Sequence, residues 1–447
     1  PRIMILGGGF AGVTTALELA KRTAGVLPVD ITLVSEQNFF LFTPMLAEAA
    51  TGAVETRHVL YPIRPLCGKW GVEFGEMSVE AIDLDRRRVI VRHRRSAVRQ
   101  RVHYDKLVLA LGATPNVDMA PGAAEHALPF KEAGDTMRIR NRVINLFETA
   151  ALSDDPWVQR QRLTFVVVGA GHAGTELMAA LEELTREILL SHYPSIRQDS
   201  VRLVLVGSTI LPQTVTKLAA YAQEQLLARG IEHEKARAAA VSREGLHLKD
   251  GRTIPSQCVI WTAGTRVSPV VASLHLPKAR DDRLKVNEFF EVEGARDVYA
   301  LGDNAAQINP HTGAPYVATA QVAIRQARAL AKVLVAELTG QEKKPFRFQV
   351  LGEMVPLSRR TAVADLNLFP PKLLRFKLFR KLSQSNLFRK LFERSLIGFK
   401  AWFLWKTIYM LKLPTPAARV RVVLDWTVEL FFERDVSELT VKPEQEP

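Results

Sequence analysis

The sequence has few cysteines, lacks long hydrophobic runs and, between residues 372 and 412, has almost no acidic residues. Its only cysteines, Cys67 and Cys258, exclude a disulfide scaffold, a cysteine-ligated zinc site and a CxxC redox motif. The absence of a long hydrophobic run argues against a membrane-spanning helix. No signal peptide is recognisable before the first expected strand, which begins within a few residues of Pro1.

The remaining composition is that of an ordinary globular protein. Apolar residues make up 47% and charged residues 24% of the 447 residues. These values argue against disorder. A chain about three times as long as the ~150 residues of one domain predicts two or three domains.

The net charge of +13 is concentrated in one segment. Residues 372–412 contain eleven lysines and arginines, with Glu393 as the only acid. A charge this localised predicts contact with an anionic surface. We interpret the arginine-rich stretch 86–101 as a solvated β-hairpin, with contact to a polyanion as the alternative.

The N-terminal stretch predicts a strand, a glycine-rich turn, a helix and a second strand. An apolar strand at residues 3–6 leads into a G-x-G-x-x-G motif formed by Gly7, Gly9 and Gly12. Gly7 permits a tight turn, Gly9 lets the backbone approach a pyrophosphate, and Gly12 lets the helix pack on the strand. Glu36 follows the second strand, where a carboxylate can accept a ribose hydroxyl.

The same pattern recurs about 160 residues later. A strand at 165–168 precedes Gly169, Gly171 and Gly174, and a helix and a strand at 201–206 follow. One such motif is weak evidence, but two in the same strand-to-helix context predict two dinucleotide sites. FAD and a nicotinamide nucleotide are the usual pair.

Three further strands end in residues typical of these folds. Strands at 106–111 and 259–262 run into glycine-containing turns at 112–115 and 263–265, which we read as crossovers between nucleotide domains. A strand at 298–301 ends at Gly302-Asp303, and a helix from about 316 to 338 follows. We therefore predict a first domain at 1–115 and 270–364, a second at 116–269 inserted in it, and a C-terminal region at 365–447.

Four stretches together resemble the type II NADH dehydrogenases, the non-pumping NADH:quinone oxidoreductases of the two-dinucleotide-binding flavoprotein superfamily. They are residues 38–46, 169–176, 320–323 and 398–409. The first two are shared with sulfide:quinone reductases, and the last two are more specific. The resemblance implies an α/β fold with two Rossmann-like domains, like that of glutathione reductase, plus an amphipathic C-terminal membrane-binding region.

The resemblance also implies the chemistry. NADH or NADPH delivers a hydride to the flavin N5 of FAD, and two electrons pass to a membrane quinone without proton pumping. The expected FAD-contacting residues are Gly7, Gly9, Phe10, Ala11, Gly12, Glu36, Thr43, Pro44, Ala110, Gly112, Asp303, Thr319, Ala320 and Gln321. The expected NAD(P)H-contacting residues are Gly169, Gly171, Gly174, Glu176, Gly207, Ser208 and Gly264. No metal is expected.

Glu176 and Gln321 are the expected catalytic residues. Glu176 is expected to orient the nicotinamide or relay a proton, with a helix-start acid favoured by the helix dipole as the alternative. Gln321 is expected near the flavin pyrimidine and the quinone carbonyl, with a capping or surface residue as the alternative. The family usually has a further glutamine at the position of Arg325, and here Gln326 follows instead. His172 is read as a variable position rather than an acid–base group, and Thr43 and Pro44 have an ordinary loop as their alternative.

One departure from the family bears on nucleotide selectivity. NADH-preferring members end the strand after the second motif with an acid that repels a 2′-phosphate, whereas this strand ends in Gly207, Ser208 and Thr209. No arginine lies beside it to clamp a phosphate. We predict relaxed selectivity, with NADH slightly favoured and less than about 100-fold preferred over NADPH.

The basic C-terminal region has three interpretations. Apolar and charged residues separate onto two helix faces at 387–394, and an aromatic segment at 396–413 carries Lys400, Lys406 and Lys412. This predicts a helix lying in a membrane interface with snorkelling lysines. Together with the quinone chemistry that the resemblance implies, we expect the membrane to be a bacterial inner membrane and the protein to lie on its cytoplasmic face. A charged face over a dimer helix is the second interpretation, with residues 420–431 as a strand or helix that packs back or dimerises. Nucleic-acid binding is the third, and no groove-entering motif supports it.

Two other functions stay open. A sulfide:quinone-type reductase needs paired cysteines at the flavin, which Cys67 and Cys258 do not resemble in spacing. An NAD(P)H-sensing flavoprotein would act through partner binding instead of turnover.

Overall fold

The chain divides into two compact units. The structure is a computed structural model that describes residues 1–93, 96, 98–349, 352–366 and 395–438. Unit 1 comprises Pro1–Leu41, Leu60–Thr114 and Thr265–Val350, and unit 2 comprises Phe42–Val59, Pro115–Gly264 and Leu351–Pro447. The units are defined by compactness and the predicted domains by cofactor, so the predicted domain boundaries stay a prediction.

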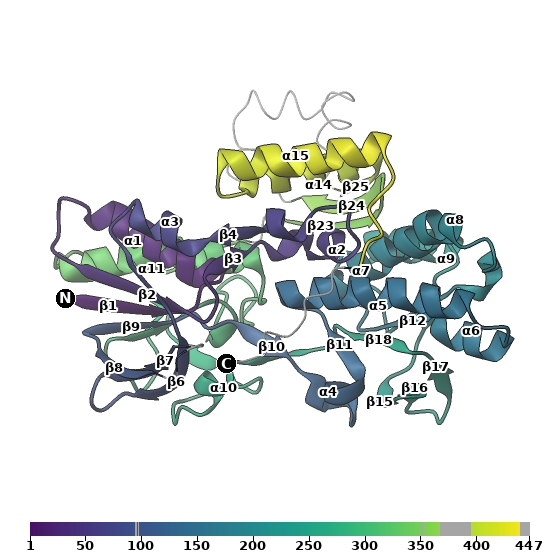
Figure 1. Cartoon of the computed structure of the whole chain (residues 1–447). Coiled ribbons are helices and arrows are strands. Elements are labelled where there is room, and N and C mark those ends of the chain that lie inside the picture. Colours follow the sequence, from purple (N-terminus) through teal and green to yellow (C-terminus); the bar gives the residue numbers. More distant parts are fainter. Residues whose placement is uncertain (94–95, 97, 350–351, 367–394, 439–447) are drawn as a thin grey trace. The chain divides into compact units, whose positions relative to one another are not determined.

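Unit 1 is built on a five-stranded parallel sheet with strand order β21-β9-β1-β2-β5 (Figure 1). Its strands are β1 (Arg2–Leu6), β2 (Asp30–Ser35), β5 (Glu73–Glu76), β9 (Lys106–Leu109) and β21 (Val298–Ala300). Central strands of a parallel sheet are covered on both faces, which explains why β1 and β9 read as continuous apolar runs. Ile5 and Leu107 are fully buried.

Two long helices of unit 1 pack on each other. They are α1 (Phe10–Thr23), which follows β1, and α11 (Ala320–Leu338), which follows β21. Both helices bury alanines and leucines, among them Ala16 and Ala327. The glycine-rich turn and the later Gly-Asp turn therefore belong to one packed layer.

Smaller elements complete unit 1. The arginine-rich stretch forms antiparallel strands β7 (Arg88–Arg92) and β8 (Arg99–His103) beside β6 (Ser78–Asp83), so the predicted hairpin is confirmed. The others are β3 (Phe39–Leu41), β4 (Leu60–Pro62), α3 (Ile63–Gly68), β10 (Ala113–Pro115), β19 (Thr265–Val267), α10 (Pro269–Ala272), β20 (Leu284–Val286), η6 (Gly302–Asn304) and β22 (Ala305–Gln307).

Unit 2 contains a second five-stranded parallel sheet, with strand order β11-β18-β12-β13-β14. Its strands are β11 (Ala127–Pro129), β12 (Thr164–Val168), β13 (Arg202–Val206), β14 (Glu232–Glu234) and β18 (Cys258–Trp261). Helix α7 (His172–Glu182) follows β12 and continues into a π-helical stretch, η4 (Glu183–Leu189). The predicted α/β fold with two Rossmann-like parallel sheets is thus confirmed.

The remaining elements of unit 2 surround this sheet. They are η1 (Thr43–Met45), α2 (Leu46–Ala50), η2 (Thr56–Val59), η3 (Val117–Met119), α4 (Ala123–His126), α5 (Ala133–Ala151), α6 (Pro156–Arg162), α8 (Leu190–His192), η5 (Gln198–Ser200), α9 (Thr216–Ala228), β15 (Ala238–Ser242), β16 (Gly245–Leu248) and β17 (Thr253–Pro255). A three-stranded antiparallel sheet, two helices and a tail form the C-terminal part. They are β23 (Gly352–Ser358), β24 (Thr361–Leu366), β25 (Ser395–Gly398), α14 (Phe399–Lys412) and α15 (Pro416–Phe431).

Two expected helix boundaries are wrong. The helix expected from about 316 begins at Ala320, because Thr319 has an extended backbone and its hydroxyl caps the helix by accepting from the Val322 N–H. The helix expected across 396–413 begins at Phe399, because residues 395–398 pair with β24 as β25. Gly398 then turns the chain at φ +69°. The helical pattern at 387–394 lies outside the described residues.

Candidate functional site

The first glycine-rich turn in unit 1 has the close packing that its sequence predicts. A Cβ on Gly7 would lie 2.1 Å from the Ala110 carbonyl oxygen, and Gly7 has φ +117°. A Cβ on Gly12 would lie 1.8 Å from the Gly7 oxygen. A Cβ on Gly9 would meet nothing within 4 Å, so Gly9 faces open space. Gly7 and Gly12 are therefore required by the fold, whereas Gly9 leaves room for an approaching ligand.

The N-terminus of α1 has no side-chain cap. Gly9 is its N-cap, and its first turn has no acid. Such a terminus attracts an anion through its N–H groups and dipole. Phe10 packs edge-on against Phe40, with ring centroids 4.8 Å apart. Glu36 is exposed directly after β2.

The Gly-Asp turn reaches the same place in unit 1. A Cβ on Gly302 would lie 3.3 Å from Ala11 and 3.7 Å from Ala323, so this turn meets the starts of both α1 and α11. The Gly302 N–H donates to the side-chain oxygen of Gln326 at 2.9 Å. Asp303 is half-buried in this turn. Three sequence-distant segments, each predicted to contact FAD, therefore converge.

One buried atom beside this turn supports a ligand. Asn304 donates through Nδ2 to the Gly112 carbonyl at 2.7 Å, but its Oδ1 is buried without a hydrogen-bond partner. Buried polar atoms are rarely left unpaired unless water or a ligand satisfies them. The residues present thus fit a dinucleotide such as FAD, whose pyrophosphate would have room beside Gly9 at the start of α1. Gln321, Ala320 and Thr319 lie at the start of α11, as expected.

Unit 2 repeats the glycine geometry. Gly169 has φ +114°, and a Cβ there would lie 2.8 Å from the Ala263 backbone nitrogen. A Cβ on Gly174 would lie 1.8 Å from the Gly169 oxygen, whereas one on Gly171 would meet nothing within 4 Å. Gly171 is the uncapped N-cap of α7. This second cradle fits the pyrophosphate of a nicotinamide nucleotide, and Gly264 lies in a neighbouring turn at φ +70°.

The end of β13 is shaped by its neighbours. The Gly207 N–H donates to the Glu234 carbonyl at 3.0 Å, and His233 Nε2 donates to the Gly207 carbonyl at 2.7 Å. A Cβ on Gly207 would lie 2.8 Å from the Ala170 Cβ. An acidic side chain at position 207 would therefore force Ala170 in the glycine-rich turn to move. Ser208 is exposed beside it.

Glu176 is a half-buried residue with a perturbed acidity. It is the fifth residue of α7, beyond the first helical turn, so the dipole alone does not explain it. Burial among protein atoms, and to a lesser degree the negative charge of Glu48, raises the pKa of Glu176 to about 8. Some of the side chain remains accessible, because Glu176 lines a cavity. A carboxyl that is neutral near pH 7 can donate a proton.

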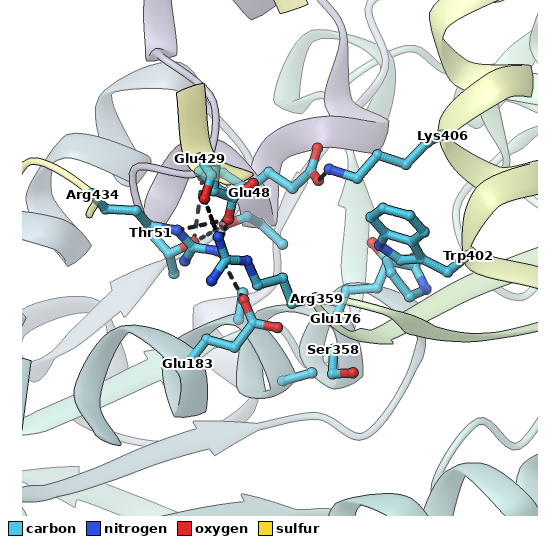
Figure 2. Close-up of a pocket in the computed structure, with 15 residues that line it drawn as sticks. Glu48, Thr51, Glu176, Glu183, Ser358, Arg359, Trp402, Lys406, Glu429 and Arg434 are labelled. Atoms are coloured by element: carbon cyan, nitrogen blue, oxygen red, sulfur yellow. Dashed lines mark hydrogen bonds and ion pairs between the residues drawn. The ribbon is translucent and has the colours of Figure 1, made fainter. Parts of the chain in front are cut away.

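This cavity lies wholly within unit 2, between α2, α7, η4, the β23–β24 turn, α14 and α15 (Figure 2). Its charged lining consists of Glu48, Glu176, Glu183, Arg359, Lys406, Glu429 and Arg434. Thr51, Ser358, Trp402 and Pro356 complete much of the wall, together with four alanines. Tyr409 lies close enough for the charge of Glu176 to raise the pKa of its hydroxyl further, although burial is the larger cause.

Lys406 is not a snorkelling lysine, so that expectation is wrong for this residue. Its ammonium lies 3.0 Å from Glu48 Oε1, and its side chain is only 11% exposed. It also lies 5.3 Å above the Trp402 ring and 4.2 Å above the Trp426 ring. Two aromatic faces and one carboxylate hold the charge inside the protein.

Sequence reasoning missed Glu48 and its pairing with Lys406. The signal is visible in hindsight: Glu48 is the only charged residue from Phe42 to Val54, and Lys406 interrupts an aromatic segment. An isolated charge in an apolar run predicts a buried partner. The partner could not be deduced, because the two residues are more than 350 positions apart.

The segment at 42–45 packs against helix α14. Phe42 is buried, and its ring lies 6.2 Å from that of Tyr409. Thr43 and Pro44 are half-buried in η1. His172 bonds to Glu353 at 3.0 Å and so links α7 to β23. This structural contact is consistent with the prediction that His172 is not an acid–base group.

Helices α14 and α15 carry exposed apolar side chains. They are Phe399, Phe403, Leu411, Val420, Val423, Leu424, Val428, Leu430 and Phe431. Of the helices within the described ranges, none combines the length and hydrophobicity that crossing a bilayer requires. Among the same residues, no group of histidines, cysteines and acids could hold a metal ion.

Comparisons with known proteins agree with this geometry. The profile of the pyridine nucleotide-disulphide oxidoreductase family matches residues 1–327. The chain is 32% identical over 368 residues to the demethylphylloquinone reductase NdbB of Synechocystis sp., which covers 81% of this chain and 86% of that protein. It is 29% identical over 459 residues to the type II NADH:quinone oxidoreductase Ndh of Mycobacterium tuberculosis, which covers 99% of this chain and 91% of that protein.

A solved structure shows the same fold. The structure of NDH2 from Plasmodium falciparum in complex with NADH has a TM-score of 0.85 to this chain at 18% identity, and the match covers 98% of this chain and 99% of that one. The expected family is thereby confirmed. The chain belongs to the pyridine nucleotide-disulphide oxidoreductase family and, within it, to the type II NADH dehydrogenases.

Proposed function

We propose that this chain is an FAD-dependent NAD(P)H:quinone oxidoreductase that does not pump protons. The observation that carries the proposal is the pair of glycine cradles, each with one open glycine, Gly9 in unit 1 and Gly171 in unit 2. A flavin held in the first cradle supplies the chemistry that side chains lack, because it accepts a hydride and returns two electrons. The balanced reaction is NAD(P)H, one proton and a quinone giving NAD(P)⁺ and a quinol.

The protein supplies binding, orientation and a proton. Gly9 and the α1 N-terminus hold the FAD pyrophosphate, and Asp303 binds the ribitol chain. Gly171 and the α7 N-terminus hold the nicotinamide nucleotide. Glu176 acts as the protonated acid, which its raised pKa supports. Gln321, at the start of α11, positions the flavin and the quinone carbonyl.

We also propose that an anionic lipid surface is the partner of the C-terminal part. The exposed apolar side chains of α14 and α15 are accompanied by Lys400, Lys412 and Arg421, all exposed. Apolar side chains beside cations suit an interfacial helix pair. A lipophilic quinone would enter from this surface, at the cytoplasmic face of a bacterial inner membrane. A second copy of the chain is the competing occupant of these helices.

The cysteines argue against a sulfide:quinone-type reaction. Cys67 and Cys258 are both buried and free, in the cores of units 1 and 2 respectively. Burial raises the pKa of the Cys67 thiol to about 11 and that of Cys258 to about 12, which keeps both protonated and unreactive.

Steady-state assays test the proposed activity. The FAD-loaded protein should oxidise NADH only when a soluble short-chain quinone is present, with equal consumption of both substrates. A protein that binds NADH and FAD but shows no quinone-dependent turnover would contradict the proposal and support the sensing function instead.

A further inference from the structure

The cavity of unit 2 is lined by more charged side chains than the packing of its helices requires. About 40 Å³ of it is open to the centre of a water molecule. A water needs roughly 10–15 Å³ measured in this way, together with several polar partners. The cavity is therefore large enough for about two or three waters.

Two buried atoms in its wall lack partners. Glu48 Oε2 and Arg434 Nη1 are both buried without a hydrogen bond, although the other oxygen of Glu48 pairs with Lys406 and the other nitrogens of Arg434 pair with acids. One is an acceptor and the other a donor. Leaving either unpaired would cost about 1–3 kcal/mol or more. Water entering the cavity would satisfy both atoms.

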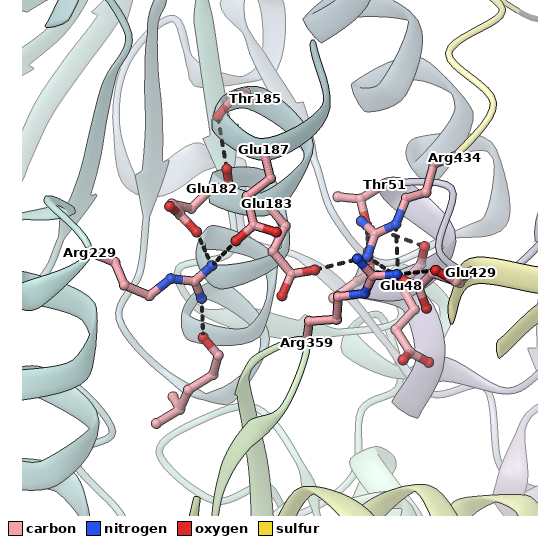
Figure 3. A network of polar contacts seen from close by, with 12 residues as sticks. Glu48, Thr51, Glu182, Glu183, Thr185, Glu187, Arg229, Arg359, Glu429 and Arg434 are labelled. Atoms are coloured by element: carbon pink, nitrogen blue, oxygen red, sulfur yellow. Dashed lines mark hydrogen bonds and ion pairs between the residues drawn. The ribbon is translucent and has the colours of Figure 1, made fainter. Parts of the chain in front are cut away.

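The cavity walls are held by ion pairs. Arg434, three residues after the end of α15, bonds Glu183 of η4 at 2.8 Å and also Glu429 of α15 (Figure 3). Arg359 donates to the Glu429 backbone carbonyl. Arg359, which lines the cavity, is exposed, so the cavity wall reaches the protein surface on this side, whereas Arg434 is buried.

Glu176 and Glu48 lie on facing helices across this space. Helix α7 packs against α2, and the negative charge of Glu48 acts directly on Glu176. The other charged or titratable groups around this part of α7 are Lys406 and Tyr409 of α14, Glu183 of η4, Arg359 after β23, Glu429 of α15, Arg434 of the tail, and the His172–Glu353 pair at the start of α7.

We propose that this cavity is a hydrated proton-delivery site, in which Glu48 and ordered water pass solvent protons to Glu176. The inference rests on the proposed function, because each turnover takes one proton from solvent. When Glu176 gives its proton to the reduced quinone, its carboxylate takes one from a cavity water. Glu48 Oε2, the unpartnered oxygen, then gives a proton back to this water, and Glu48 accepts a new proton from solvent through another water while Lys406 holds Oε1 in place.

Variants that change the charge of Glu48 or Lys406 should shift the pKa of Glu176 in opposite directions, which a merely structural role of these residues would not produce. Glu48→Gln removes a negative charge near Glu176 and leaves Lys406 unpaired, so the pKa of Glu176 falls by about one unit. Lys406→Met leaves Glu48 uncompensated and raises it by about one unit. The double variant E48Q/K406M returns it toward wild type and keeps the site folded if Glu48→Gln alone does not.

Infrared spectroscopy of the oxidised holoenzyme measures the pKa of Glu176 without turnover. The carboxylic C=O band that disappears in Glu176→Gln belongs to Glu176, and its pH titration gives the pKa in each variant. Glu187→Gln is the matched control, since Glu187 lies on η4, pairs with Arg229 and does not line the cavity. It should leave the band unmoved.

Chemical rescue tests delivery itself. Glu48→Ala should slow reoxidation of the reduced flavin by quinone about tenfold at pH 7 while leaving reduction by NADH unchanged, and added formate should restore the rate. Equal titrations in Glu48→Gln, Lys406→Met and wild type, or a Glu48→Ala rate that formate does not raise, would overturn the inference. A wild-type enzyme that reduces no quinone would instead remove the proposed function, and the infrared titration would still report whether Glu48 and Glu176 are coupled.

Discussion

Among the individual side chains, Glu176 is one whose ionised form lowers the stability of the folded protein. A carboxyl with an ordinary pKa of 4.5 in the unfolded chain has a pKa of about 8 in the folded protein, because burial and Glu48 disfavour its charge. Between these values the folded state binds more protons than the unfolded state. The free energy of unfolding therefore decreases as the pH rises through this window.

Glu176→Gln removes that cost. We expect the variant to melt at a higher temperature than wild type at pH 8, with a gain that shrinks steadily toward pH 5. Calorimetry of both proteins across this range measures it. A gain that is constant with pH would mean that Glu176 is charged in the folded protein at neutral pH.

Glycines in one motif are predicted to fail in different ways. Gly12→Ala places a methyl group 1.8 Å from the Gly7 oxygen, so the protein should unfold or lose several kcal/mol of stability. Gly9→Ala meets no protein atom within 4 Å. It should therefore keep the apoprotein melting temperature close to wild type but weaken FAD retention, because the pyrophosphate needs that space.

Bound FAD per protein and apoprotein melting curves separate the two glycine variants. Gly25→Ala, on a surface turn with nothing within 4 Å, controls for a methyl group outside the cradle. Because Gly25 has φ +69°, a modest loss of stability is expected there, and FAD content should be unchanged. Full FAD retention in Gly9→Ala would remove Gly9 from the proposed site.

At the scale of single elements, we expect the end of β13 to determine nucleotide selectivity. The close approach of Gly207 to Ala170 leaves Ser208 as the first position that can carry a longer side chain. Ser208→Glu should lower kcat/KM for NADPH relative to NADH by about tenfold, because a carboxylate repels the 2′-phosphate. Ser208→Gln has the same length without the charge and should leave the ratio nearly unchanged. Equal ratios in the two variants would place the 2′-position elsewhere.

Short-range patterns predicted the elements but not their partners. Strand and helix order around both glycine motifs followed from local periodicity and turn chemistry. The start of α11 was missed because a hydroxyl cap at Thr319 overrides the apolar pattern before it. The strand β25 was missed because its role as a strand depends on pairing with β24, which no local pattern encodes.

The candidate sites divide in the same way. Gly7, Gly12 and Gly174 could be assigned from sequence, since their spacing alone requires the close contacts that the structure has. The Glu48–Lys406 pair could not, because a buried ion pair between distant segments leaves only two isolated charges in the sequence. The roles of Glu176 and Gln321 stay predictions.

At the scale of the whole molecule, the C-terminal helices should control attachment to lipid. The full-length protein should sediment with vesicles containing phosphatidylglycerol and much less with neutral phosphatidylcholine vesicles, and added salt should release it. Phe403→Glu places a charge on an exposed apolar position of α14 and should reduce binding, whereas Leu152→Glu, exposed at the end of α5, should not. Stable dimers with no vesicle binding would favour the second copy of the chain as the occupant.

The proposed reaction requires one flavin to be reduced by the nucleotide and reoxidised by a quinone. Anaerobic stopped-flow absorbance measures both half-reactions in the same protein. NADH should bleach the flavin band, and NADPH should do so with a kcat/KM within about 100-fold of that for NADH. A short-chain ubiquinone or menaquinone analogue should then restore the band fully. A flavin that bleaches with either nucleotide and never regains its absorbance with any quinone would contradict the account.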